Sequence, residues 1–197
     1  QGVTPDLRFG DLSHFPVILV SADLNSRRPV YYGNNPQTSV LEGLLASTAL
    51  PPWVHPIESE GRFLIDGGAV SNLPIEPAIA HGATEVIALG LSNPDEIDLN
   101  AHGFGPFWTK YLYTVEARQI SLELELAQAK GVPVHIVNLK TESPVPAWDF
   151  SQTQFLLDDG YRQMKLALDS GEISPSYKTK SWFAPLKRLI TFWSKSN

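Results

Sequence analysis

The stretch Ile65-Asp66-Gly67-Gly68 places an acidic side chain at the end of an apolar, strand-like run, directly before two glycines. Two glycines let the backbone turn tightly, so the carboxylate of Asp66 is expected at the carboxyl end of this strand. Open α/β sheets bind ligands at that edge, and a carboxylate there can act as a general base. The same residues also fit a plain turn that Asp66 caps, because Asp-Gly is a common turn dipeptide. Asp66 is the candidate catalytic residue, with Gly67 and Gly68 forming the active-site turn.

The sequence offers no competing metal or thiol chemistry. No two of the five histidines are four residues apart, and no His-Glu-x-x-His pattern occurs. His135 alternates with Val134 and Ile136, which predicts a structural residue in a strand. The 197 residues contain no cysteine, which excludes a thiolate zinc site and a cysteine nucleophile within them. The net charge of −6 argues against a nucleic-acid partner, which normally requires a basic surface for the phosphates.

The elements that must position Asp66 alternate between strands and helices. Strands are predicted at 15–22, 29–32, 61–65, 85–90 and 132–139, with a turn at 23–28 that makes the first two a hairpin. Helices are predicted from a cap at Thr38 or Ser39, and at 75–81, 107–130 and about 152–168, while 92–106 is predicted to be a loop. This alternation indicates an α/β layered fold with a largely parallel sheet.

The C-terminal segment 177–197 differs in charge from the body, residues 1–176. It carries five basic residues and no acidic one. Its apolar side chains recur at three- and four-residue spacing, which is typical of a basic amphipathic helix at a membrane surface. The same stripe also fits a terminal helix packed onto the domain. The candidate membrane-contact residues are Trp182, Phe183, Leu186, Trp193, Lys187 and Arg188.

Two linked stretches resemble the patatin-like phospholipase family. They run from Leu45 to Pro52 and from Gly61 to Ala78, and the second contains Asp66-Gly67-Gly68-Ala69-Val70-Ser71-Asn72-Leu73-Pro74. Further support comes from Ala22-Asp23-Leu24-Asn25, Gly82-Ala83-Thr84-Glu85-Val86-Ile87 and Asp159-Gly160-Tyr161. The resemblance covers roughly residues 9–170.

This resemblance implies a three-layer α/β/α sandwich and the hydrolysis of lipid acyl esters by a Ser–Asp dyad without histidine. Asp66 matches the aspartate of that dyad. No metal or organic cofactor is implied, and the implied partner is a lipid or acyl-ester substrate. The family resemblance and the tail together lead us to expect a cytoplasmic or peripheral membrane protein.

The nucleophile that the resemblance implies is absent from these 197 residues. The family carries it in Gly-x-Ser-x-Gly at a sharp strand-to-helix turn, and no such motif occurs here. The nearest stretch, Gly90-Leu91-Ser92-Asn93-Pro94, ends in proline, and we interpret Ser92 as a loop serine. Ser47 and Ser71 are interpreted as packed or capping hydroxyls. We therefore expect a C-terminal part of a patatin-like domain, lacking the N-terminal strands and inactive alone.

Two hypotheses remain open at this point. In the first, a missing N-terminal segment or a companion chain supplies the serine and its glycine-rich oxyanion loop. In the second, the chain is a non-catalytic lipid-surface or partner-binding module that has kept the fold.

Overall fold

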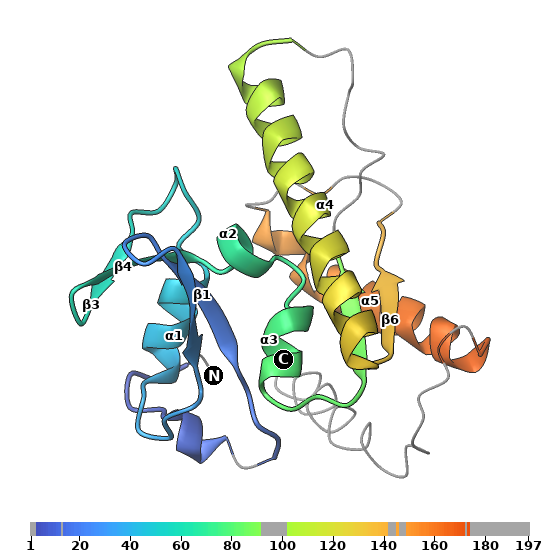
Figure 1. Ribbon diagram of the computed structural model, residues 1–197, viewed down its shortest axis with the longest axis horizontal. Coiled ribbons are helices and arrows are strands. Elements are labelled where there is room, and N and C mark those ends of the chain that lie inside the picture. The colour runs from blue at the N-terminus through green and yellow to red at the C-terminus, as the bar shows by residue number, and fades with distance from the viewer. Residues whose placement is uncertain are drawn as a thin grey trace. The chain divides into compact units, whose positions relative to one another are not determined.

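The computed structural model describes residues 3–12, 14–91, 102–141, 145, 149–171 and 173. These residues divide into two compact units, one within 1–138 and one within 139–197 (Figure 1). The candidate tail residues Trp182, Phe183, Leu186, Lys187, Arg188 and Trp193 lie outside the described residues, and so does Ser92. None of the described helices combines the length and apolar character needed to cross a membrane.

The first unit contains a four-stranded sheet in the order β2-β1-β4-β3. Its strands are β1 (Leu19–Asp23), β2 (Arg28–Tyr32), β3 (Ile57–Ser59) and β4 (Arg62–Asp66). Every neighbouring pair in this sheet is antiparallel. The predicted hairpin of β1 and β2 is confirmed, whereas β3 was not predicted.

The β1–β2 turn is closed by Asp23. Its carboxylate accepts hydrogen bonds from the Asn25 N–H at 3.0 Å and from the Ser26 hydroxyl at 2.7 Å. These bonds, that of the Ser26 hydroxyl first, lower the pKa of Asp23 from its ordinary value. The second turn joins β3 to β4 through Glu60 and Gly61, both with positive φ. Such short connections can only join antiparallel strands.

A parallel pair of strands forms the other sheet of this unit. The strands β5 (Val86–Gly90) and β6 (Val134–Asn138) pair in parallel, with Ile87 opposite His135, and the crossover between them includes α4 (Phe104–Lys130). The prediction of a largely parallel sheet is thus correct for β5–β6 and wrong for the four-stranded sheet. Tight turns explain the antiparallel β1–β2 and β3–β4 pairs, because a parallel connection needs a dozen or more residues. The β1–β4 pair joins segments about forty residues apart, so no turn sets its direction.

The remaining elements are helical. The capping prediction for the first helix is confirmed, since Ser39 Oγ accepts from the Glu42 N–H at 3.4 Å. α4 begins at Phe104, three residues earlier than predicted, because Pro106 lies in the first turn, where a missing N–H costs nothing. It ends at Gly131 with φ of 68°. The others are η1 (Phe9–Asp11), α1 (Val40–Ser47), α2 (Gly68–Ser71), α3 (Ile75–Ala80), η3 (Phe150–Gln152) and α5 (Thr153–Asp169).

Two hydrophobic clusters stabilise the first unit. One packs α1 against the four-stranded sheet through Phe9, Tyr32, Val40, Ala46 and Leu64. The other joins α3, α4 and β5 through Leu73, Ile75, Val86, Ala88 and Ala127. The segment from Asp66 to Asn72 connects these two clusters along the chain, so both contribute to fixing its position.

Candidate active site

Asp66 is the last residue of β4 and is half-buried. Its N–H donates to the Ala49 carbonyl at 3.0 Å, which ties the strand end to the residues following α1. Its Oδ1 accepts from the Gly68 N–H at 2.8 Å. Among the described residues, Oδ2 has no hydrogen-bond partner. The carboxylate is therefore oriented through one oxygen and can accept a proton on the other.

The two glycines after Asp66 are required for different reasons. A Cβ on Gly67 would lie 2.2 Å from the carbonyl oxygen of Val20, a backbone atom of β1. A Cβ on Gly68 would lie 2.9 Å from Asn72 Oδ1 and 3.1 Å from Asp66 Oδ1. Gly67 lets the turn pass close to β1, and Gly68 leaves room for the carboxylate itself. The turn assigned to Gly67 and Gly68 from the sequence has this structural basis.

The four-residue helix α2 follows immediately and contacts α4 (Figure 1). The Ser71 hydroxyl donates to Glu123 Oε1 at 2.6 Å, and Gln119 Nε2 donates to the Ala69 carbonyl at 3.0 Å. Asn72 Nδ2 donates to Glu116 Oε1. Ser71 is thus a buried, hydrogen-bonded hydroxyl, as the sequence suggested. The α4 partners were not predicted, because sequence spacing does not reveal which element a helix faces.

Ser21 is a further residue near Asp66 that was not identified from the sequence. It lies directly opposite Asp66 in the β1–β4 ladder, so both side chains project from the same face of the sheet. Ser21 is fully buried, and its Oγ has no hydrogen-bond partner among the described residues. A buried hydroxyl without a partner is unusual. A serine between Val20 and Ala22, in the otherwise apolar run 15–22, was the available signal.

Other polar groups in the described residues do not build a competing site. His135 Nε2 of β6 lies 3.0 Å from Oε1 of Glu85, the residue before β5, which fits the structural role predicted for His135. No group of three metal-binding side chains occurs in the part of the chain that the structure describes. A hollow of about 370 Å³ lies beside Tyr32, Glu42, Ser59 and Arg62, and Asp66 does not line it.

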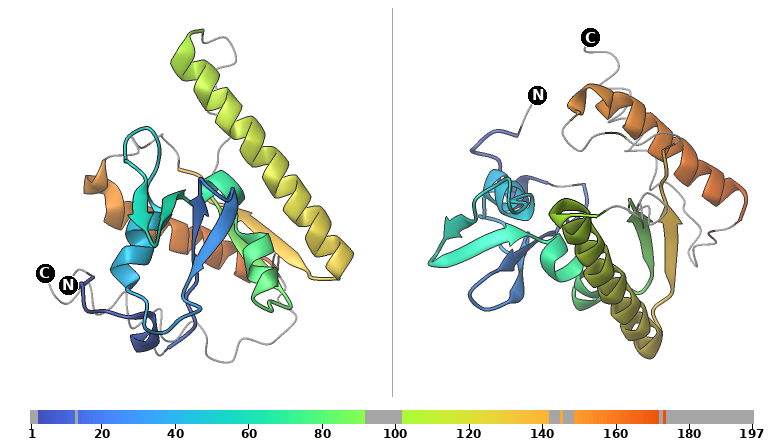
Figure 2. Two further views of the ribbon diagram at one scale, coloured as in Figure 1. Left: turned by 60° about the vertical axis from the view of Figure 1, so that its left-hand side comes forward. Right: turned by 90° about the horizontal axis from the view of Figure 1, so that it is seen from above.

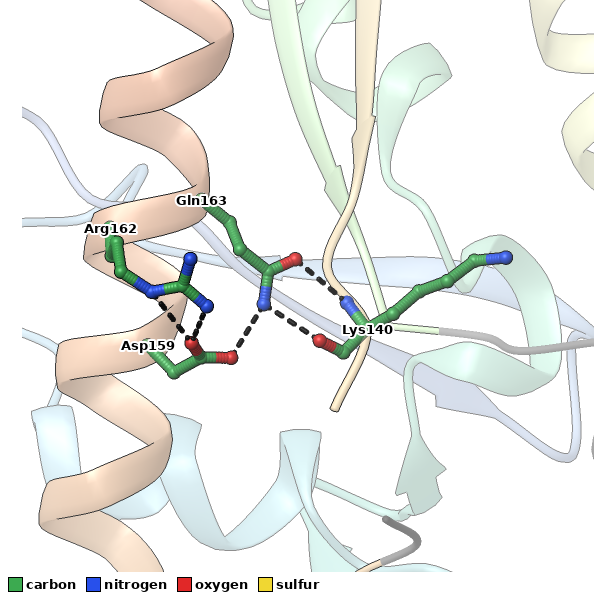
Figure 3. Close-up of polar contacts among 4 residues, drawn as sticks. All are labelled: Lys140, Asp159, Arg162 and Gln163. Carbon is green, nitrogen blue, oxygen red and sulfur yellow. Dashed lines mark hydrogen bonds and ion pairs between the residues drawn. The ribbon is translucent and has the colours of Figure 1, made fainter. Parts of the chain in front are cut away.

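The Asp159-Gly160-Tyr161 stretch lies in α5, where Asp159 belongs to a polar cluster (Figure 3). Asp159 accepts from Arg162 and, at 2.6 Å, from Gln163 Nε2. These hydrogen bonds, that of Arg162 first, lower the pKa of Asp159 from its ordinary value. Gln163 also accepts from the Lys140 N–H at 3.0 Å and donates to its carbonyl at 2.7 Å. The cluster therefore joins α5 to the chain that follows β6.

Comparison with known proteins places the candidate site in a matched region. Residues 3–79, which include Asp66, match the model of the patatin-like phospholipase family. The chain is 39% identical over 64 residues to the human patatin-like phospholipase domain-containing protein 6, covering 32% of this chain and 4% of that protein. It is 37% identical over 57 residues to the lysophospholipase NTE1 of Mycosarcoma maydis, covering 29% and 3%.

A third relative aligns over a longer stretch of the chain. Neuropathy target esterase sws of Drosophila melanogaster is 28% identical over 110 residues, covering 52% of this chain and 8% of the relative. The resemblance to the patatin-like phospholipase family is therefore confirmed. The aligned segments span less than a tenth of the length of these three relatives.

Proposed function

We propose that this chain is the base-carrying part of a patatin-like serine acyl hydrolase that cleaves acyl esters of lipids. The observation that carries the proposal is Asp66. It ends β4, is oriented by the Gly68 N–H, presents a second oxygen without a partner in the described residues, and lies within the matched region 3–79. The nucleophile in this proposal is a serine outside the 197 residues, in an N-terminal segment or a companion chain.

The chemistry would run in two steps. The serine hydroxyl attacks the acyl carbonyl while Asp66 Oδ2 takes its proton, and this proton then passes to the departing alcohol oxygen as the ester bond breaks. Asp66 next takes a proton from water as the water oxygen attacks the acyl-enzyme carbonyl. It returns this proton to the serine oxygen as the acyl–serine bond breaks, which releases the fatty acid and restores both the serine hydroxyl and the carboxylate. The Gly68 N–H keeps the carboxylate in place through both steps.

The two sheets of the described residues are separate, which supports the idea that further strands join them in the intact protein. The four-stranded sheet and the β5–β6 pair are distinct in the described residues. The outward-lying Leu89 of β5 is 48% exposed, which is unusual for a strand of a two-sided layered fold. We propose that the nucleophile-bearing segment adds strands that complete one three-layer α/β/α sandwich.

The test is labelling of the intact protein with a serine-reactive fluorophosphonate, followed by esterase assays of Asp66→Asn. We expect labelling of a polypeptide or segment beyond the 197 residues, and a loss of about 10³-fold or more in kcat for Asp66→Asn. Asp158→Asn is the matched control, because Asp158 is exposed on α5. Retained activity in Asp66→Asn would overturn the dyad assignment.

The absence of Gly-x-Ser-x-Gly from these residues favours a second candidate function. A non-catalytic module with the same fold would bind a lipid surface or a protein partner without turnover. Failure of the intact protein to label, together with no esterase activity, would favour that module over the hydrolase.

A further inference from the structure

Three polar side chains of α4 meet the segment that follows Asp66. Glu116, Gln119 and Glu123 follow one another at intervals of three and four residues, so they share one face of the helix. They contact Asn72, the Ala69 carbonyl and the Ser71 hydroxyl, respectively. Figures 1 and 2 show α2 lying beside α4. Two of the four residues of α2, Ala69 and Ser71, and the next residue, Asn72, are therefore hydrogen-bonded to α4.

Glu123 is the central member of this set. It is 8% exposed, and its two carboxylate oxygens are both occupied: Oε1 accepts from the Ser71 hydroxyl and Oε2 accepts from the Glu76 N–H at 2.7 Å. A buried carboxylate is costly unless its oxygens are paired. Here, the pairing links the end of α2 to the first turn of α3. An isolated four-residue helix is not stable by itself, so contacts with other elements hold α2, and these hydrogen bonds to α4 are among them.

We propose that Glu123 is a positioning residue for Asp66, acting through Ser71 and α2, with Gln119 as its auxiliary. The inference rests on the proposed function of Asp66. The connection is short: Glu123 holds Ser71 at the end of α2, and Gly68 at the start of α2 donates to Asp66 Oδ1. If α2 shifts, the Gly68 N–H moves with it and the carboxylate loses its orientation. Glu123 itself does not touch the reacting atoms.

The activity test compares Glu123→Gln and Ser71→Ala with Glu125→Gln in the intact protein. Glu125 is on the same helix but is exposed, with Arg118 and Ser121 as its partners. We expect both test variants to lose about tenfold to a hundredfold in kcat with little change in KM, because a misplaced base slows chemistry and leaves substrate binding intact. Glu125→Gln should match the wild type.

A second readout does not depend on catalysis. Amide hydrogen exchange at Gly68 reports the bond to Asp66, and we expect it to accelerate by about tenfold in both test variants and not in Glu125→Gln. Should Glu123→Gln fail to fold, Ser71→Ala removes only one hydroxyl and carries the same test. Unchanged kcat and unchanged Gly68 exchange in a folded Ser71→Ala variant would overturn the positioning role.

The two proposals fail in different ways. If Asp66→Asn keeps its activity, the function of Asp66 is wrong, and the positioning role in catalysis is wrong with it. If Asp66→Asn is inactive while Glu123→Gln and Ser71→Ala keep wild-type kcat, the dyad assignment holds and only the positioning inference is overturned. A rise in KM alone would likewise count against positioning.

Discussion

The two halves of α4 differ in a way that inverts the usual expectation. The C-terminal half, from Glu116 to Lys130, buries Glu123 and Ala127 and holds α2 and α3. The N-terminal half, from Phe104 to Val115, leaves most of its aromatic side chains exposed: Phe104 is 78% exposed and Phe107 62%. A glutamate is thus buried while phenylalanines of the same helix remain exposed.

The contrast shows that side-chain type alone does not decide burial along a helix. Three rings of the first half stack in a row, Phe104 on Trp108 and Trp108 on Tyr111. In the second half, Glu123 is buried because the Ser71 hydroxyl and the Glu76 N–H donate hydrogen bonds to its carboxylate. Ala127 is buried because α3 and β5 supply an apolar surface for it. Burial follows from the available partner.

The largest expected effect is for a substitution in the segment that the C-terminal half of α4 contacts. Gly67→Ala would drive a Cβ into the Val20 carbonyl, a backbone atom that cannot move without shifting β1. We expect the free energy of unfolding to fall by about 3 kcal/mol or more, with loss of the esterase activity that we propose. Urea denaturation of the intact protein measures the change.

The matched control is Gly105→Ala in the exposed half of α4, where no atom lies within 4 Å of the added Cβ. It should stay within about 0.5 kcal/mol of the wild type. Equal effects of the two substitutions would contradict the difference between the two regions.

An intermediate effect is expected from a larger side chain in the C-terminal half of α4. Ala127 is 1% exposed and lies in the cluster with Ile75 and Val86. Ala127→Leu should destabilise the protein by about 1–3 kcal/mol, because the added carbons have no space. Ala129→Leu, on the exposed side of the same half, serves as the control in thermal unfolding. A stable Ala127→Leu variant would show that the α3–α4 packing is looser than described.

The smallest effect is expected for a substitution in the N-terminal half of α4. Phe107→Ala removes a ring that is mostly in solvent, so the free energy of unfolding should change by no more than about 0.5 kcal/mol. The same urea titrations provide the comparison with Ala127→Leu. A loss above about 2 kcal/mol would mean that Phe107 is covered in the intact protein and that the two halves of α4 are alike.

Features that depend on neighbouring residues were predictable. The β1–β2 hairpin follows from its turn residues, and Ser39 caps α1 as its type suggests. Gly131 ends α4 with a positive φ, as expected for glycine after a helix. The position of Asp66 at a strand end and its glycine turn were also correct, because adjacent residues specify them.

Features that depend on distant residues were not predictable. The antiparallel β1–β4 pairing joins segments about forty residues apart and overrides the alternating pattern that suggested a parallel sheet. The helix α2 contains a glycine and is very short, so its own sequence carries almost no helical signal. Glu123 resembles an ordinary surface residue of an amphipathic helix until Ser71 and the Glu76 N–H lie against it.

The sequence by itself determined a local feature: an aspartate at the end of a strand, followed by two glycines, in a stretch that resembles the patatin-like phospholipase family. The tertiary structure alone decided which distant residues surround this feature. It brought the Val20 carbonyl close to Gly67 and placed Ser21 opposite Asp66. It also placed the Glu123 carboxylate within hydrogen-bonding distance of the Ser71 hydroxyl. The reason is physical: turns and caps are fixed by bonds within a few residues, whereas a buried carboxylate is stable only where distant segments supply its donors.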